Sequence, residues 1–377
     1  MEWLLKLNMG RGFLVMKYVD LAIIGGGPAG LCAAISAASS GAKVLLIDRN
    51  KELGGQLVKQ THMFFGSEKQ YASTRGVNIA KILLNDLIKY ENNVEIMTDA
   101  TVLGIYEDGI ISIDHNKKYI KVNPKAILIA TGASEKVLAF PNNDLPGIYG
   151  AGAVQTLMNV YGVKPGNKVL MVGAGNIGLI VSYQLMQAGV KVAAIVDAAP
   201  RIGGYLVHAS KIRRMGVPIL TGHTVKEAIG DNCLEKVVIW KLDKEWKPIE
   251  GTEIDFDVDV MCISVGLTPL TELIMQAGCE IKYVPELGGL VPVRDQNYRS
   301  TKNNIFVAGD VSGVEEASSA MVEGYLSGLC AAKSIGYEHK HFNDLSQDYI
   351  AQLNSLRSGV VGEKIRSGIS KIVREVI

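Results

Sequence analysis

Short apolar runs that alternate with glycine-rich turns predict a parallel α/β architecture. The first run, residues 21–24, leads into a glycine turn, a small-residue segment to about Ser40, and a second apolar run at 44–47. Buried parallel strands read as continuous apolar runs, and helices connect them. Residues 19–48 are therefore expected to form a strand, a helix and a parallel strand.

The same pattern returns in the second half of the chain. Residues 168–197, KVLMVGAGNIGLIVSYQLMQAGVKVAAIVD, repeat the layout of residues 19–48, VDLAIIGGGPAGLCAAISAASSGAKVLLID. Each copy continues into a strand-rich segment that alternates as a small β-meander does. The repeat predicts two Rossmann-like, three-layer domains, each with a meander, the second domain inserted in the first.

The glycines in each copy have the spacing that a dinucleotide requires. Gly25 makes the tight turn, Gly27 leaves room for a pyrophosphate, and Gly30 lets the helix pack on the strand. The helix N-terminus offers free N–H groups and a partial positive charge. Asp48 follows where an acceptor for ribose hydroxyls belongs. The second copy repeats these positions with Gly173, Gly175, Gly178 and Asp197.

A third landmark is a short apolar strand, residues 305–308, that ends in Gly309-Asp310 and precedes a small-residue helix at about 315–334. Asp310 is placed to accept hydrogen bonds from a sugar-alcohol chain. The positive end of the following helix points at the same spot. Pro/Gly-rich crossovers then suggest the domains: 17–147 with 268–337, 148–267, and a tail at 338–377.

Composition excludes several classes of function. The formal charge is +1, which gives no signature of nucleic-acid binding. The five cysteines include no CxxC, so no zinc or iron–sulfur spacing and no metal site is expected. Reduced thiols favour a cytoplasmic location. No apolar run is long enough to span a membrane, and residues 1–15 are interpreted as an upstream start or a short arm.

The three landmarks together resemble the two-dinucleotide-binding-domain flavoproteins, the pyridine nucleotide-disulfide oxidoreductase superfamily. The resemblance implies an FAD-dependent oxidoreductase, with FAD in the first copy and NAD or another nucleotide in the second. The FAD residues that it implies are Gly25, Gly27, Pro28, Ala29, Gly30, Asp48, Arg49, Gly55, Gln56, Thr131, Gly132, Gly309 and Asp310. For the second nucleotide they are Gly173, Gly175, Asn176, Ile177, Gly178 and Asp197.

Within the superfamily, the missing cysteine pair sets the chain apart from the disulfide reductases. Residues 140–158 and 192–204, with the Asp310 segment, look more like the subunits of sarcosine oxidase (alpha), hydrogen cyanide synthase, dye-linked proline dehydrogenase and opine oxidase. This likeness implies a subunit of a multi-subunit amine or amino-acid dehydrogenase or oxidase, in which hydride passes through flavin N5. The implied partners are other subunits of such an enzyme, or further copies of the chain, and a small-molecule substrate.

Two alternatives stay open beside this interpretation. One is an NAD(P)H-dependent flavoprotein reductase that passes electrons to a protein or quinone acceptor. The other is a non-catalytic electron-transfer or scaffold subunit. Asp197 favours NAD over NADP. Ile180, however, stands where NAD(P)H-using relatives carry a glutamate, which leaves NAD(H) chemistry at the second site open.

Two segments carry further candidates. The polar stretch at 55–78 supplies Gln56, Lys59 and His62 as candidate catalytic groups, with the alternative that they are solvated or purely structural. In the tail, apolar residues at 361, 365, 369, 372 and 376 form a helical stripe among basic side chains. The stripe fits a membrane surface, a partner subunit or the chain's own domain.

Overall fold

The computed structural model describes residues 16–374, with the backbone alone at 360–361, and forms two compact units. Unit 1 comprises the described residues of Met1–Leu57, Ile79–Ala133 and Pro269–Ile377, and unit 2 comprises Val58–Asn78 and Ser134–Thr268. The expected arm or upstream start at residues 1–15 lies outside the described residues. Each unit is described by itself.

The division differs from the expected domain boundaries in three respects. Residues 58–78, expected in the first domain, belong to unit 2. The long segment of unit 2 begins after Ala133 rather than after residue 147. The described residues of the expected tail belong to unit 1.

Unit 1 is built on a sheet with the strand order β3-β2-β1-β6-β5-β4, and β19 also pairs with β6. The pairs β1–β2, β2–β3, β1–β6 and β6–β19 are parallel, whereas β4, β5 and the first half of β6 pair antiparallel as a meander. The strands are β1 (Met16–Ile24), β2 (Val44–Ile47), β3 (Val94–Met97), β4 (Ala100–Ile105), β5 (Ile111–His115), β6 (Lys118–Ile129) and β19 (Ile305–Val307).

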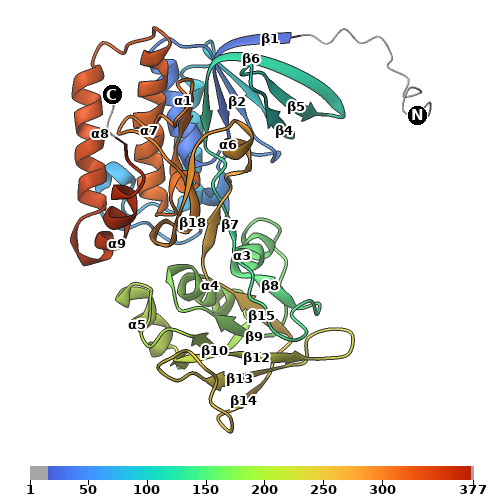
Figure 1. Cartoon of the computed structure of the whole chain (residues 1–377). Helices are drawn as coiled ribbons and strands as arrows, with labels where there is room; N and C mark the ends of the chain where they lie inside the picture. The colour runs from blue at the N-terminus through green and yellow to red at the C-terminus, as the bar shows by residue number, and fades with distance from the viewer. Residues whose placement is uncertain (1–15, 375–377) are drawn as a thin grey trace. The chain divides into compact units, whose positions relative to one another are not determined.

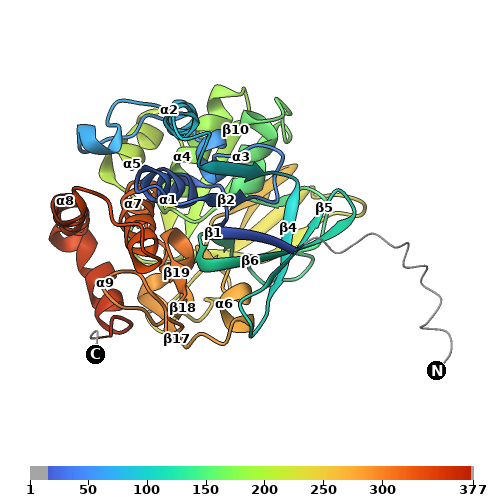
Figure 2. The same ribbon diagram turned by 90° about the horizontal axis from the view of Figure 1, so that it is seen from above.

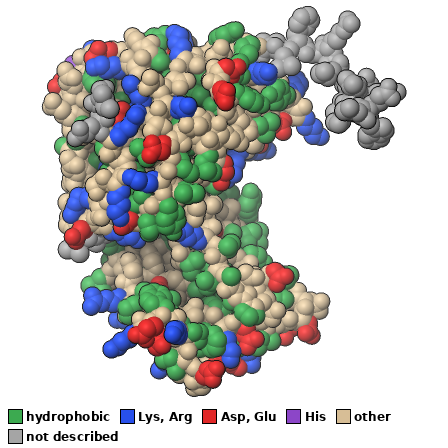
Figure 3. Space-filling model, in the orientation of Figure 1, with side chains coloured by type: hydrophobic (Ala, Val, Ile, Leu, Met, Phe, Trp, Pro, Cys, Tyr) green, Lys and Arg blue, Asp and Glu red, His purple; other side chains and the backbone are tan. Residues whose placement is uncertain are grey.

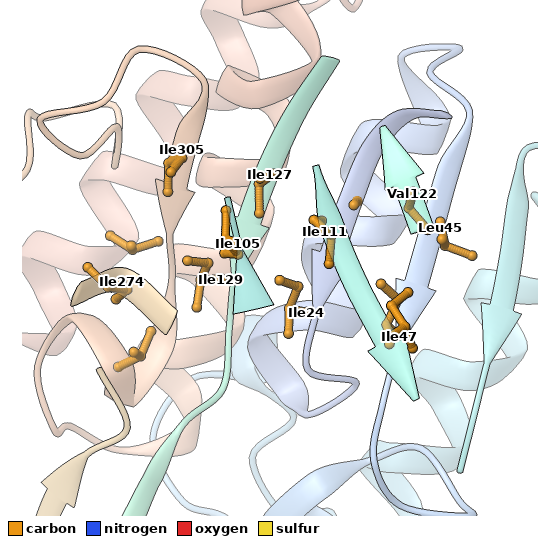
Figure 4. Close-up of a cluster of buried hydrophobic side chains, with 14 of the residues drawn as sticks. Ile24, Leu45, Ile47, Ile105, Ile111, Val122, Ile127, Ile129, Ile274 and Ile305 are labelled. Carbon is orange, nitrogen blue, oxygen red and sulfur yellow. The ribbon is translucent and has the colours of Figure 1, made fainter. Parts of the chain in front are cut away.

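One apolar core of unit 1 lies between the parallel strands and the meander of this sheet. Side chains from β1, β2 and β6 meet those of β4 and β5, and Ile274 of α6 (Glu272–Gln276) joins them, as Figure 4 shows. The strands of the parallel layer are largely buried, which explains their continuous apolar runs.

Two glycines let helices α1 (Pro28–Ser39) and α7 (Ala317–Ser334) pack backbone to backbone. A Cβ at Gly324 would lie 2.1 Å from Ala29 O, and one at Gly328 would lie 2.4 Å from Ala33 O. The two helices lie side by side in Figures 1 and 2, with α8 (Phe342–Leu356) outside α7. This close approach places the first two turns of α1 beside the middle of α7. Helix α2 (Gly76–Ile88) follows the polar segment.

Unit 2 repeats the plan with a five-stranded sheet in the order β11-β10-β9-β15-β8, in which every pairing is parallel. Helices cover one face and the meander β12-β13-β14 covers the other, so the sheet has a core on each side (Figure 1). The helices are α3 (Ala151–Asn159), α4 (Asn176–Gln187) and α5 (Leu206–Arg214). The strands are β8 (Ile148–Gly150), β9 (Lys168–Val172), β10 (Lys191–Asp197), β11 (Ile219–Thr221), β12 (His223–Ile229), β13 (Lys236–Lys241), β14 (Ile254–Asp257) and β15 (Val260–Ile263).

These features confirm the predicted α/β class with two Rossmann-like domains and two meanders. Two of the four places where the chain crosses between the units lie in β7 (Ala133–Glu135) and β16 (Leu267–Pro269), which pair with each other.

The last described helix packs within unit 1. Ile365, Ile369 and Ile372, in and just after α9 (Gly359–Ser370), contact a small core beside the hairpin β17 (Ile281–Val284) and β18 (Gly289–Pro292). The described part of the apolar stripe is therefore used within the unit; the side chains at 361 and 376 lie outside the described residues.

Charges of both signs occur on the face of the molecule that Figure 3 shows. Acidic and basic side chains are interspersed over the face in Figure 3, in line with the formal charge of +1. Among residues 16–374, no helix is both long enough and apolar enough to cross a bilayer.

Candidate cofactor site

Two glycines of the first loop are required by the fold itself. Gly25 has φ +107°, and a Cβ there would lie 2.3 Å from Ala130 O. A Cβ at Gly30 would lie 1.7 Å from Gly25 O, where α1 crosses the end of β1. No larger side chain fits either position without moving the backbone.

Gly27 is different, because none of the described residues lies close enough to require a glycine there. Its φ of −76° and ψ of −171° are open to any residue, and a Cβ would meet only Gly55 Cα, at 3.8 Å. Gly27 is also the N-cap of α1, and no side chain caps that helix. A residue without a side chain in front of uncapped N–H groups leaves room for a phosphate to approach the backbone closely.

Two backbone hydrogen bonds hold the Asp48 carboxylate in place and leave it able to accept further hydrogen bonds. Its Oδ2 accepts a 2.6 Å bond from the Gly26 N–H and its Oδ1 accepts a 2.7 Å bond from the Asn50 N–H. Each carboxylate oxygen has two lone pairs, so both can still accept a ribose hydroxyl. The side chain is buried at the end of β2.

The loop of unit 2 reproduces this geometry. Gly175 has φ −75° and ψ 179°, and a Cβ there would have no atom within 4 Å. Asp197 accepts bonds from the N–H groups of Ala174, at 2.6 Å, and Ala199, at 2.8 Å.

The first turn of α4 differs from that of α1 in its side chains. Asn176 Oδ1 accepts the Tyr205 N–H at 2.8 Å, a bond that Pro28, at the corresponding position of the first loop, cannot make. Ile177 is exposed and Ile180 is half-buried on α4.

The third landmark lies against the first loop. A Cβ at Gly309 would lie 2.8 Å from Ala29 Cβ, so the end of β19 lies beside the first turn of α1. Asp310 Oδ1 accepts one long bond, 3.3 Å, from the Glu315 N–H. Burial, helped by the nearby Glu323 and Glu315, raises the pKa of Asp310 to about 7. A desolvated carboxyl with one weak partner fits a ligand that brings hydroxyl groups.

The remaining positions assigned to FAD fall around the same loop or on the surface of unit 1. Thr131 Oγ1 donates to Leu270 O at 2.8 Å, and Gly132, with φ +77°, faces open space. A Cβ at Gly55 would lie 2.7 Å from Gly27 Cα. Arg49 and Gln56 are exposed.

The candidate catalytic side chains fall in different units. Gln56 lies in the 3-10 turn Gly55–Lys59 on the unit 1 side of the boundary, whereas Lys59 and His62 belong to unit 2. Lys59 Nζ donates to Gly152 O at 3.0 Å. Burial lowers the pKa of Lys59, and the nearby negative charge of Glu135 partly opposes that shift.

His62 stacks on Phe64, with 5.7 Å between ring centroids, and its Nδ1 is buried without a hydrogen-bond partner. Burial and, to a lesser degree, His208 lower the pKa of His62 to about 4. At neutral pH the ring is therefore neutral, and it is a weaker base than a solvated histidine.

Sequence reasoning missed a cluster behind Asp310. Glu315, Glu323 and Arg357 form buried ion pairs, and Tyr298 also bonds to Glu323. The available signal was Glu323, an acid within the otherwise small and apolar run of α7.

The five cysteines are free thiols, four of them buried. Among the described residues, no group of histidine, cysteine and acidic side chains has the arrangement of a metal site.

A family model for pyridine nucleotide-disulphide oxidoreductases matches residues 19–324. The chain belongs to this family. Membership covers both glycine loops and the Asp310 segment, and it identifies the chain as a flavin-dependent oxidoreductase with FAD as its cofactor.

Curated relatives are similar over most of the chain. An opine oxidase subunit from Agrobacterium tumefaciens is 27% identical over 330 residues, which cover 83% of this chain and 65% of that protein. Hydrogen cyanide synthase subunit HcnB from Pseudomonas aeruginosa is 27% identical over 323 residues, 81% of this chain and 69% of that protein. The chain thus spans about two thirds of the length of these relatives.

Among solved structures, L-proline dehydrogenase from P. horikoshii superposes with a TM-score of 0.67 at 24% identity, over 90% of this chain and 60% of that one. At this identity the likeness establishes a shared fold. The resemblance inferred from the sequence motifs is therefore confirmed.

Proposed function

We propose that the chain is the FAD-carrying subunit of a multi-subunit dehydrogenase or oxidase that acts on an amine or amino acid. The observation that carries the site assignment is Gly27, a glycine that the fold does not need, in front of an uncapped helix. The printed names of the relatives, subunits of opine oxidase and of hydrogen cyanide synthase, support the substrate class and the subunit role.

In this proposal, different residues around the first loop bind different parts of the cofactor. Gly27 and the N-terminus of α1 take the pyrophosphate, Asp48 takes the adenosine ribose, and Asp310 takes the ribityl hydroxyls. When bound, FAD supplies the acceptor for a hydride from the substrate C–H, and the amine, having also lost an N–H proton, leaves as an imine. The substrate itself is held by a partner subunit.

A second function has a specific observation in its favour. In the loop of unit 2, a Cβ at Gly175 would meet no atom within 4 Å, and Asp197 accepts two backbone hydrogen bonds; Gly27 and Asp48 are the corresponding residues of the first loop. This supports an NAD(P)H-dependent reductase that passes electrons to a protein or quinone acceptor. Ile180, which stands where NAD(P)H-using relatives carry a glutamate, supports the third interpretation, a scaffold or electron-transfer subunit that does not bind substrate.

One experiment separates these functions. The purified chain is reconstituted with FAD and mixed anaerobically with NADH or NADPH, and then, with a co-expressed partner subunit, with proline or sarcosine. Bleaching by the amine only when the partner is present supports the main proposal. Fast bleaching of the chain alone by NADH or NADPH supports the reductase and contradicts the scaffold. A protein that cannot be reconstituted with FAD contradicts all three.

A further inference from the structure

A buried guanidinium links the C-terminal helical segment to the strand end that carries Asp310. Arg357, which ends α8, donates to the Glu315 carboxylate from Nε, at 3.0 and 3.1 Å, and from Nη2, at 2.7 Å. The same Nη2 also donates to Glu323 Oε1. The three side chains are at most 11% exposed, so water screens these charges little.

Glu323 in turn fastens the turn that contains Asp310. Its Oε2 accepts the Gly309 N–H at 2.8 Å and the Ser312 hydroxyl at 3.2 Å. Its Oε1 accepts the Tyr298 hydroxyl at 3.0 Å. Gly309 and Ser312 are the two ends of the 3-10 turn Gly309–Ser312, so the Glu323 carboxylate contacts both ends; the single Ser312 hydroxyl proton is shared between Glu323 and Gly309 O, which lies 3.0 Å away.

Arg357 offsets part of the negative charge in this cluster. Asp310, Glu315 and Glu323 place three carboxyl groups near the N-terminus of α7. In the described part of the chain, Arg357 is the one lysine or arginine that forms an ion pair with either glutamate. Burial and the neighbouring Glu323 raise the pKa of Glu315, and Arg357 opposes that rise. A buried pair that loses one partner leaves an uncompensated charge.

We propose that Arg357 is a positioning residue of the FAD site: it holds Glu315 and Glu323 in place and thereby fixes the turn that presents Asp310 to the cofactor. This inference rests on the proposed function, because it takes Asp310 and the N-terminus of α7 as groups that face FAD. The segment after residue 337 is then an integral part of the cofactor site and not a separate tail.

The test compares Arg357→Met, Arg357→Lys and a control, Lys364→Gln, which removes an exposed cation from the same C-terminal segment. Thermal unfolding of each apoprotein, the FAD dissociation constant and the midpoint potential of the bound flavin are measured. We expect Arg357→Met to weaken FAD binding about 10-fold or more, which is ~1.4 kcal/mol. Its midpoint potential becomes more negative, because a nearby cation no longer favours the added electrons.

Arg357→Lys separates charge from geometry. Lysine keeps the positive charge but cannot form the bidentate fork. The midpoint potential is therefore expected to return to the wild-type value while FAD affinity recovers only in part. The control is expected to match wild type in all three measurements.

A folded Arg357→Met protein with the affinity and potential of the control overturns the inference. If Arg357→Met does not fold, Arg357→Lys decides: weakened FAD binding at an unchanged potential supports the inference, and wild-type affinity overturns it. The proposed function fails separately, through a wild-type chain that FAD cannot reconstitute.

Discussion

Replacing Gly27 by alanine should weaken FAD binding while leaving the stability of the apoprotein nearly unchanged. A Cβ at this position meets no atom closer than 3.8 Å, and the backbone is in an extended conformation that alanine adopts freely. Alanine is a poorer N-cap than glycine, by less than about 1 kcal/mol. It also lowers the entropy of the unfolded chain, which stabilises by about 0.4–1 kcal/mol. These effects oppose each other, so the apoprotein should keep its stability within about 1 kcal/mol.

FAD binding should respond quite differently to the same methyl group. The methyl would occupy the space in front of the uncapped N-terminus of α1, where we propose that the pyrophosphate binds. Steric overlap of one methyl in a close-packed site costs about 1–3 kcal/mol. That cost corresponds to a dissociation constant about 5- to 150-fold larger. Titration of the apoprotein with FAD, followed by flavin fluorescence, measures this change.

Two further alanine variants complete the comparison. Gly175→Ala makes the same change in the loop of unit 2, where a Cβ also meets nothing, and should leave both stability and FAD affinity unchanged. Gly30→Ala, whose Cβ would lie 1.7 Å from Gly25 O, should destabilise the apoprotein itself. The reasoning is refuted if folded Gly27→Ala binds FAD as tightly as wild type, or if Gly175→Ala weakens FAD binding equally.

Three other changes test separate parts of the structure. Asp48→Asn replaces one carboxylate oxygen by an NH₂ group, so that two donors face each other where one backbone N–H had an acceptor. The free energy of unfolding, measured in urea, should fall by about 1–3 kcal/mol. Gly324→Ala places a Cβ 2.1 Å from Ala29 O and should cost about 1–3 kcal/mol in thermal unfolding, whereas Gly203→Ala, whose Cβ meets nothing, should not. Burial lowers the pKa of His62 from 6.5 to about 4, so the unfolded chain binds the proton more tightly. Stability should therefore fall as pH drops from about 6.5 toward 4, and His62→Phe should flatten that dependence.

The sequence contained enough to predict the layers of both units. Apolar runs that alternate with small-residue helical segments are compatible with few folds other than a parallel α/β sheet. The repeat showed the same pattern a second time. The acids at 48 and 197 were predicted as acceptors, and their paired backbone bonds are alike in the two copies. Local spacing determines such features, because strand, turn and helix are contiguous in the chain.

The Arg357 cluster was beyond prediction for a physical reason. Arg357 lies 34 residues from Glu323 and 42 from Glu315, and only tertiary packing of α8 on α7 brings them together. In the sequence, Arg357 is one of several basic residues near an apolar helical stripe, which fits a surface as well as an interior. The unit boundary between Leu57 and Val58 was missed similarly, since it falls within one short polar segment.

The most direct test of the central claim is the amount of FAD that stays with the purified chain after reconstitution and removal of free cofactor. The account predicts about one FAD per chain, with the ratio preserved in Gly175→Ala and reduced in Gly27→Ala. A colourless wild-type protein, or a flavin lost from Gly175→Ala but kept by Gly27→Ala, would contradict it.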